Sequence, residues 1–553
     1  MDPLPNAEYG NSGFVGRGDA MLQLVEKFAL KMAICSLKYN KSYGLILTSS
    51  HLNPRDTSFQ LVLSNGELPN GSVHMAKIQA WKELSLDCFK SRFIEVKRMY
   101  IGTRKLKDNF IGKFFISVDD RPESQEILNY VVELFNLVGY KPKYYSILRS
   151  TPTPQVSFII DIWMNDYDRQ KYLLNKQLYY SIKTNWILKA FDAISLRNVG
   201  RYENTVHLEY SNSSTFPKYS FCENISSVIK LICPNVFEGG QLSGECGPYF
   251  VLINRKLPAI FQGHKYKKMV SCDADGDKLL YYFLNGNSLN LISGDKMAVF
   301  FATLIHDILK DCEMLEGIRL CVIQSPFANG ASTEFLAKKG IDTVFVKGGN
   351  SQMRAEAQKY DVGIYFETSG HGSIYFSIRF RTNIQTEMRD KHVFIMAEDD
   401  SRSDLVWHDK YLPDCERRLI HPQVLILHYI SKLINPQTGD GTANMLTFEF
   451  CLRYLGFSIR DVYDMYQELP SVVLTKEVFT AKNYKVTDDG RRLSEYTDLQ
   501  EVIDSLVKVN GGRATIIPSS MTNTLRIYAE NQTLAGATEV ARSIRHELDT
   551  QFV

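Results

Sequence analysis

The sequence has no long apolar run, no paired cysteine motif and almost no net charge. None of its apolar stretches approaches the roughly 18 residues that a membrane-spanning helix needs, so we expect no membrane partner. Its ten cysteines include no CxxC pair. That pattern favours neither a zinc site nor a disulfide framework, and it favours a reducing compartment. A net charge of +2 gives no electrostatic reason to expect nucleic acid as a partner.

The first residues lack the basic segment and the apolar core of a secretory signal, so we expect a cytoplasmic location. The chain has 553 residues, which is too long for one core and suggests about three or four domains. Apolar residues make up 44% and charged residues 23%, which is typical of a globular protein.

Strands and helices are predicted to alternate in the first part of the chain. Helical spacing of apolar residues runs over 21–32, and short apolar runs predict strands at 43–47, 59–63 and 114–118. A helix is predicted from 124 to 138. This alternation is typical of a mixed α/β domain.

A second segment has the spacing of a parallel sheet. Strands are predicted at 318–323, 343–346 and 362–366, separated by helices at 332–338 and 352–359, after a helix at 297–310. Such βαβαβ spacing predicts parallel strands with right-handed crossovers. The last hundred residues predict a small α+β domain, with strands at 515–517 and 525–529 and a closing helix at 535–547.

Three carboxylates alternate in the loop that contains Asp273, Asp275 and Asp277. Alternate residues of an extended loop point the same way, and close like charges repel unless a cation lies between them. A hard divalent ion such as Mg²⁺ fits best. A calcium EF-hand is excluded because Lys278 and Leu284 replace its sixth-position Gly and its final Glu. A solvated acidic turn is the alternative from these residues alone.

Two further polar loops follow predicted strands. Ser50 and His51 follow the strand at 43–47, but no GxSxG elbow supports a hydrolase. Residues 367–372 combine a carboxylate, hydroxyls, an imidazole and two glycines that allow a ligand close to the backbone. Each loop alone is also compatible with an ordinary turn. Together with the aspartate loop, they suit a polyol with a charged group, held from several sides.

Seven motifs, in order along nearly the whole chain, resemble those of the α-D-phosphohexomutases, and within them the eukaryotic phosphoacetylglucosamine mutases. The stretch 9–14 resembles YGTAGF, 48–51 resembles TASH with its phosphorylated serine, and 273–278 resembles the Mg²⁺ loop DGDADR. Residues 327–333 resemble YANGSST, and 365–372 resemble YFEANGHG, the sugar-binding loop. Residues 437–441 and 526–530 resemble QTVGDA and RVYAE.

The resemblance implies four domains around a central cleft, at 1–180, 181–292, 293–440 and 441–553. It implies interconversion of N-acetylglucosamine 6-phosphate and 1-phosphate on the route to UDP-N-acetylglucosamine, with Mg²⁺, through a phosphoserine and a sugar bisphosphate intermediate. We expect an amino-sugar phosphate as the substrate, and a monomer. The implied roles are catalysis by Ser50, His51 and Lys278; metal binding by Ser50, Asp273, Asp275 and Asp277; substrate binding by Glu367, Thr368, Ser369 and His371; and phosphate binding by Ile517, Pro518, Ser519, Ser520, Met521 and Arg526.

The sequence departs from the family mainly at cationic positions. The terminal phosphate loop RPSGTE corresponds to residues 517–522, which lack its arginine and its glycine. Each uncompensated loss of a charge-assisted bond to a phosphate costs about 1.5–3 kcal/mol. We therefore keep three hypotheses: an active mutase that uses other bases such as Arg17 or Lys347, a sugar-phosphate-binding paralogue without turnover, and a mutase for another hexose phosphate.

Overall fold

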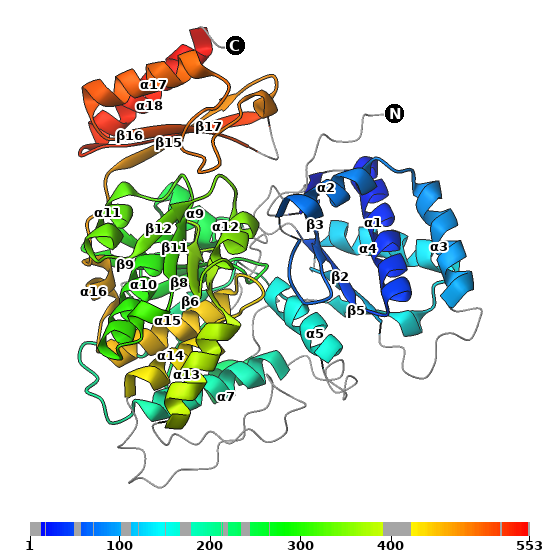
Figure 1. Cartoon of the computed structure of the whole chain (residues 1–553), viewed down its shortest axis with the longest axis horizontal. Coiled ribbons are helices and arrows are strands. Elements are labelled where there is room, and N and C mark those ends of the chain that lie inside the picture. The colour runs from blue at the N-terminus through cyan, green and yellow to red at the C-terminus, as the bar shows by residue number, and fades with distance from the viewer. Residues whose placement is uncertain are drawn as a thin grey trace.

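The computed structural model describes residues 13–16, 18–48, 57–69, 71–100, 112–119, 121–149, 151–165, 178–211, 213, 219–233, 244–264, 266–390, 422–519 and 523–550. In this part of the chain, four β-sheets with flanking helices form a mixed α/β architecture, as predicted. The first sheet lies in a separate lobe, the second and third lie in the central body, and the last lies at the opposite end of the chain (Figure 1).

The N-terminal lobe is a five-stranded sheet with helices on both faces. Its strand order is β1-β3-β2-β4-β5, with β2, β4 and β5 parallel. Side chains alternate along β2, so Leu45 and Leu47 enter the core under α1 while Ile46 enters the core under α5. The elements are β1 Phe14–Gly16, α1 Gly18–Tyr39, β2 Tyr43–Thr48, β3 Thr57–Val62, α2 Gly71–Lys82, α3 Leu86–Tyr100, β4 Phe114–Val118, α4 Pro122–Val138, β5 Tyr145–Arg149 and α5 Thr153–Asn165.

The second sheet has the order β10-β9-β8-β6-β7 and carries the aspartate loop between β8 and β9. The apolar runs 268–272 and 279–284 on either side of this loop predict strands, and β8 and β9 match them to within one residue at each end. The elements are α7 Leu178–Ala193, β6 Thr205–Glu209, α8 Tyr219–Asn224, β7 Lys230–Ile232, α9 Gly247–Asn254, β8 Met269–Cys272, β9 Leu279–Asn285 and β10 Ser288–Ile292.

The third sheet has the order β12-β11-β13-β14. The predicted parallel pairing of β12, β11 and β13 is confirmed, and β14, which was not predicted, adds an antiparallel edge. The elements are α10 Gly294–Asp311, β11 Leu320–Gln324, α11 Gly330–Lys338, β12 Asp342–Phe345, α12 Asn350–Ala357, β13 Val362–Phe366, β14 Gly372–Phe376, α13 Ile378–Asp390, α14 Pro422–Leu433, α15 Gly441–Leu455 and α16 Ile459–Tyr463.

The second and third sheets share one apolar core. Val270 and Tyr281 from the second sheet belong to the same buried cluster as Val322 and Ile364 from the third, and α10 and α15 contribute to it. This common core fixes the aspartate loop and the 367–372 loop relative to one another.

The C-terminal sheet has the order β15-β17-β16 and its own core beneath two helices. Figure 1 shows α17 and α18 together on one face of this sheet. The elements are β15 Ser471–Glu477, α17 Thr497–Asn510, β16 Arg513–Pro518, β17 Thr524–Glu530 and α18 Leu534–Thr550. None of the described helices has the length and apolar character needed to cross a bilayer.

Candidate active site

The aspartate loop is a tight connection between antiparallel strands, since Cys272 at the end of β8 pairs with Leu279 at the start of β9. Gly276 has a φ of +73°, which a residue without Cβ adopts at low cost. An added Cβ there would lie 2.9 Å from the Tyr210 hydroxyl. The N–H of Gly441 donates to the Gly276 carbonyl at 2.8 Å, so the N-terminus of α15 also holds the loop.

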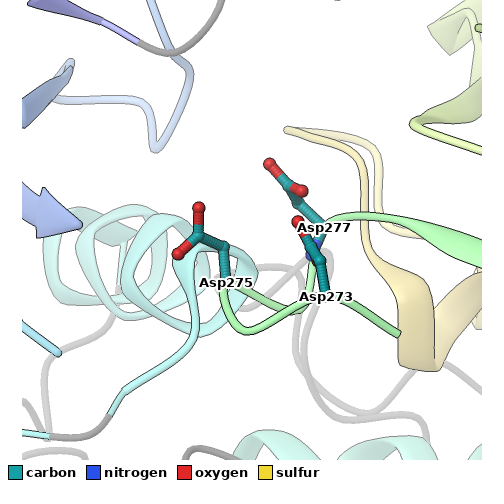
Figure 2. Close-up of side chains that lie close together, drawn as sticks. All are labelled: Asp273, Asp275 and Asp277. Atoms are coloured by element: carbon teal, nitrogen blue, oxygen red, sulfur yellow. The ribbon is translucent and has the colours of Figure 1, made fainter. Parts of the chain in front are cut away.

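The predicted convergence of the three carboxylates is confirmed. Ligand oxygens of Asp273, Asp275 and Asp277 all lie within 4.8 Å of one another. Figure 2 shows the three side chains leaving one loop toward the same side, with Asp273 and Asp277 close together. All three residues are buried. Buried carboxylates at this spacing need a cation, and an all-oxygen set suits Mg²⁺, so the residues fit the expected metal.

Lys278 partly neutralises this cluster. Its Nζ lies 2.7 Å from Asp273 Oδ2 and 2.7 Å from Asp277 Oδ1. Burial acts to lower the pKa of Lys278, but the three carboxylates outweigh it and raise that pKa well above its ordinary value. Burial, followed by the charge of Asp277, raises the pKa of Asp273 to about 6.

The N-terminal lobe contacts this loop through the strand that leads to the predicted phosphoserine. The Thr48 hydroxyl, at the end of β2, donates to Asp275 Oδ1, and the N–H of Thr153 donates to the Asp275 carbonyl at 3.0 Å. Ser50 and His51 lie outside the described residues, as does Arg17. Thr48 is therefore the described residue that links the serine segment to the carboxylates.

The 367–372 loop packs directly against the aspartate loop. A Cβ added to Gly370 would lie 1.8 Å from the carbonyl oxygen of Leu279. His371 Nε2 lies 3.5 Å from Asp277 Oδ2. Burial, with the nearby Lys278 charge, lowers the pKa of His371 to about 4. The structure thus brings the imidazole and the metal-ligand candidates together.

The other predicted substrate-binding residues lie in the same loop but have partners within the protein. Glu367 Oε1 accepts the N–H of Asn350 at 2.7 Å, at the start of α12. The Thr368 hydroxyl donates to Asp295 Oδ2 at 3.2 Å. Ser369 directly follows Thr368 in the loop and is half-buried.

The described residues among those predicted to bind phosphate lie at the end of β16, directly after it, and near the start of β17. Ile517 pairs with Arg526 across these strands, and Pro518 ends β16. The N–H of Ser519 donates to the Thr524 carbonyl at 2.9 Å. Ser520 and Met521 lie outside the described residues. Arg526 is exposed, and its guanidinium lies 5.9 Å from the centre of the Phe327 ring in the third sheet's connecting loop.

Comparisons with known proteins agree with this geometry. A family model described as phosphoacetylglucosamine mutase AMG1, domain III, matches residues 293–457. A phosphoacetylglucosamine mutase of Arabidopsis thaliana is 28% identical over 98% of this chain and 95% of its own length. The Homo sapiens phosphoacetylglucosamine mutase is 25% identical over 98% of this chain and 93% of its own. This chain is therefore similar to phosphoacetylglucosamine mutases over nearly its whole length.

Solved structures of N-acetylglucosamine-phosphate mutases share the fold of this chain. The Aspergillus fumigatus N-acetylphosphoglucosamine mutase, in complex with GlcNAc-6P and magnesium, has a TM-score of 0.79 at 22% identity, over 98% of this chain and 95% of that one. An N-acetylglucosamine-phosphate mutase of the α-D-phosphohexomutase superfamily, in its substrate complex, has a TM-score of 0.77 at 21% identity. It covers 98% of this chain and 96% of the other. The predicted phosphohexomutase fold is thereby confirmed.

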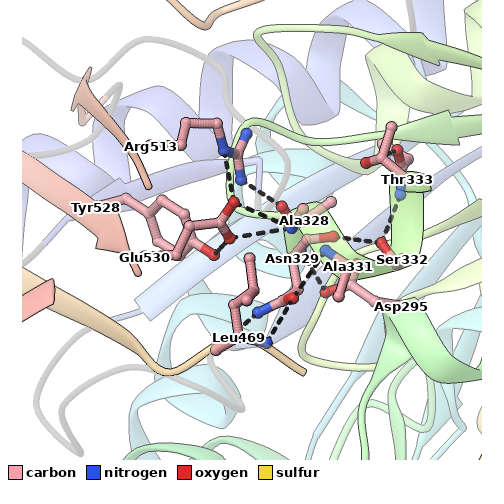
Figure 3. Close-up of polar contacts among 12 residues, drawn as sticks. Asp295, Ala328, Asn329, Ala331, Ser332, Thr333, Leu469, Arg513, Tyr528 and Glu530 are labelled. Atoms are coloured by element: carbon pink, nitrogen blue, oxygen red, sulfur yellow. Dashed lines mark hydrogen bonds and ion pairs between the residues drawn. The ribbon is translucent and has the colours of Figure 1, made fainter. Parts of the chain in front are cut away.

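A polar network joins the third sheet to the C-terminal sheet (Figure 3). The sequence motifs did not predict it. Glu530 accepts the N–H of Gly330, Arg513 Nε at 3.0 Å and the Tyr528 hydroxyl at 2.6 Å. Arg513 also donates to the carbonyl of Ala328 at 2.5 Å. The network therefore ties β16 and β17 to the start of α11.

The same junction reaches the sugar-binding loop through Asp295. Asp295 Oδ2 accepts the N–H of Asn329 at 3.4 Å and the hydroxyl of Thr368. Burial, with the Glu468 charge, raises the pKa of Asp295 to about 7. The sequence gives one signal for this network, since Glu530 lies in the RVYAE-like motif and Asn329 lies in the YANGSST-like motif. Membership of two separate motifs does not indicate that the two residues belong to one network.

Proposed function

We propose that this protein is an active mutase that interconverts N-acetylglucosamine 6-phosphate and N-acetylglucosamine 1-phosphate. One observation carries the proposal: the buried Asp273, Asp275 and Asp277 lie between Thr48, which precedes the serine segment, and His371 of the sugar-binding loop. Phosphoryl transfer needs such an acidic cluster, since a bound metal and precise positioning supply most of the catalysis. Relatives that bear this activity in their names match almost the whole chain.

We propose Mg²⁺ as the resident ion. The three aspartates offer the oxygen ligands that this ion prefers, and the related Aspergillus fumigatus structure is a magnesium complex. When bound, Mg²⁺ neutralises charge on the phosphoryl group during transfer. Lys278, paired to two of the carboxylates, balances the remaining negative charge of the cluster.

Ser50 is the proposed carrier of the phosphoryl group. Ser50 follows Thr48 by two positions in the sequence, and Thr48 contacts Asp275 of the carboxylate cluster. In the forward half-reaction, the bond from phosphorus to Ser50 Oγ breaks and a bond to a sugar hydroxyl oxygen forms. The sugar hydroxyl loses its proton to a base, for which His51 and Lys278 are the candidates. The resulting bisphosphate returns its other phosphoryl group to Ser50 after turning over.

We propose that the sugar is positioned by Glu367, Thr368, Ser369 and His371. We propose that residues 517–521 and Arg526 hold the non-reacting phosphate. Arg526 supports this role because its guanidinium is exposed near Phe327 and Arg offers a planar fork of donors to phosphate. Lys347 is less suited, since its ammonium already lies 3.1 Å from Asp488 Oδ1. We also propose the four domain boundaries given above, a monomer, a cytoplasmic location and a place on the route to UDP-N-acetylglucosamine.

The deciding experiment is a coupled assay of purified protein with Mg²⁺, N-acetylglucosamine 6-phosphate and a trace of sugar bisphosphate. We expect formation of the 1-phosphate, abolished in Ser50→Ala and by EDTA. A panel with glucose and glucosamine 6-phosphates tests the alternative sugar. Sugar-phosphate binding that depends on His371, without turnover on any sugar, would favour the binding-protein hypothesis instead.

A further inference from the structure

Two cysteines outside the candidate active site lie in direct contact. The Sγ atoms of Cys222 and Cys233 are 3.8 Å apart. Cys222 belongs to the short helix α8, and Cys233 directly follows the last residue of β7. Both residues are half-buried, whereas Cys272, Cys321 and Cys451 are buried. The pair is therefore within reach of a small solute.

The backbone holds the two thiols at this spacing. Hydrogen bonds from Ile225 N–H to the Phe221 carbonyl and from Val228 N–H to the Ile225 carbonyl fold the connection between α8 and β7. Phe221, Ile225 and Ile229 are buried in the central core. Strand β7 pairs with β6. The backbone segments that carry the two thiols are therefore held close to one another in the folded protein.

The contact does not have the composition of a metal site. Structural zinc sites use four ligands from cysteine and histidine. Among the described residues, the group of three or more possible metal ligands is the aspartate triad, and neither cysteine belongs to it. A pair of adjacent, half-exposed thiols instead matches the arrangement of a redox couple, in which one thiol reacts and a neighbour resolves the product.

We propose that Cys222 and Cys233 form a reversible disulfide when the protein meets a peroxide. The Cys222 thiolate attacks one peroxide oxygen, the O–O bond breaks, and a sulfenic acid forms with release of water after proton transfer. The Cys233 sulfur then attacks the sulfenic sulfur, the S–S bond forms and a second water leaves. Two thiols and one peroxide thus give one disulfide and two waters, a two-electron oxidation.

The two thiols differ in pKa, which supports Cys222 as the attacking thiol. A hydrogen bond from Cys233 lowers the pKa of the Cys222 thiol, and the same contact, with burial, raises the pKa of Cys233. The thiolate is the nucleophile in such reactions, so Cys222 reacts first. The sulfurs must move closer by about 1.8 Å to reach a bonded distance of roughly 2.0 Å, which side-chain rotation supplies when the backbone spacing permits.

The test is full-length protein treated with hydrogen peroxide, alkylated without reduction and analysed by peptide mass spectrometry. We expect a linked peptide that contains Cys222 and Cys233, removed by dithiothreitol. The exposed Cys88 serves as an internal control for non-specific oxidation. Alkylation of both Cys222 and Cys233 at peroxide levels that oxidise Cys88 would overturn the proposal.

Variants identify the role of each thiol. In Cys233→Ser, we expect a sulfenic acid at Cys222 that a dimedone probe traps, whereas Cys222→Ser should give little dimedone adduct at Cys233. Cys312→Ser is the matched control, since Cys312 is also half-buried beside the central core, and it should form the linked peptide as the wild type does. Equal dimedone labelling of Cys222 and Cys233 in the two single variants would contradict the proposed order.

A stability measurement checks that the link forms in the folded protein. A disulfide between Cys222 and Cys233, which are 11 positions apart, lowers the conformational entropy of the unfolded chain and so favours the folded state. Peroxide should therefore raise the melting temperature of the wild type and of Cys312→Ser, reversibly with dithiothreitol, and should not raise that of Cys222→Ser. A lower melting temperature for the peroxide-treated wild type, with the linked peptide present, would show that the link forms only at the expense of the native fold and would overturn the proposal.

Discussion

Glu530 at the end of β17 accepts the backbone N–H of Gly330 with both carboxylate oxygens, at 3.1 and 3.0 Å. The two residues are 200 positions apart in the sequence, and Gly330 begins α11. A carboxylate at the start of a helix complements the unpaired N–H groups and the positive end of the helix dipole. This contact and the Arg513 ion pair hold the C-terminal sheet against the third sheet.

Replacing Glu530 by Gln should weaken that junction. The variant leaves the half-buried Arg513 charge without its partner, and removing one member of a fully buried pair costs about 3–5 kcal/mol, which is the upper bound here. We expect a lower free energy of unfolding and faster hydrogen exchange at the Gly330 amide. Glu539→Gln changes an exposed residue of α18 and should change neither. Unaltered exchange at Gly330 in Glu530→Gln would show that the contact does not hold the two sheets.

Lys278→Met tests the charge balance of the aspartate cluster. Without the ammonium, the three buried carboxylates repel one another, and the metal-free protein should lose about 3–5 kcal/mol of stability. Added Mg²⁺ should then raise the melting temperature of the variant more than that of the wild type. The control is Lys267→Met, because Lys267 forms an exposed pair with Glu203, which contributes about 0–1 kcal/mol. A variant as stable as the wild type in EDTA would contradict this view.

Thr48→Val tests the contact between the N-terminal lobe and the aspartate loop. The change removes a hydrogen bond to a carboxylate, worth about 1.5–3 kcal/mol. If the bond positions Ser50 against the metal ligands, kcat should fall by roughly 10- to 100-fold with little change in KM. Ser58→Ala removes a neighbouring hydroxyl that donates to the Thr48 carbonyl, and it should retain most activity. Equal losses in the two variants would point to a general effect on β2.

The buried side chain of Lys183 should make the free energy of unfolding depend on pH. It is buried, donates to the carbonyls of Leu433 and Ile434, and burial lowers its pKa to about 7. Between pH 7 and its ordinary pKa of about 10.5, the unfolded chain binds a proton that the folded chain does not. Stability relative to Lys183→Met should therefore rise with pH in this window, by up to about 1.4 kcal/mol per pH unit. Urea titrations from pH 7 to 10 measure it, and a pH-independent difference would contradict burial of this amine.

Local patterns predicted most of the elements that carry the site. The strand Val362–Phe366 and the strand Phe114–Val118 were predicted exactly, because short apolar runs between turn residues have few other solutions. The aspartate cluster was predicted because the alternation of its side chains is a property of neighbouring residues.

Features that depend on a helix cap or on distant partners were not predicted. The apolar pattern predicts a helix only over 446–455, whereas α15 begins at Gly441, because Asp440 caps it by accepting the Ala443 N–H at 2.8 Å although glycine and threonine are poor helix formers. The antiparallel β14 and the Glu530 network depend on partners far along the chain. The two ion pairs of Lys278 were also not predicted. Lys278 is next to Asp277 in the sequence, but the sequence does not show that Asp273 contacts the same ammonium group.

The most direct test of the account is a single-turnover measurement of phosphate on Ser50. Protein is first phosphorylated with a sugar bisphosphate and Mg²⁺, and the phosphopeptide is then quantified by mass spectrometry before and after mixing with N-acetylglucosamine 6-phosphate. We predict phosphate on Ser50, lost to the sugar within the time of one turnover in wild type and retained after EDTA treatment. Phosphate that never appears on Ser50, or that stays there while the 1-phosphate forms, would contradict the phosphoserine mechanism.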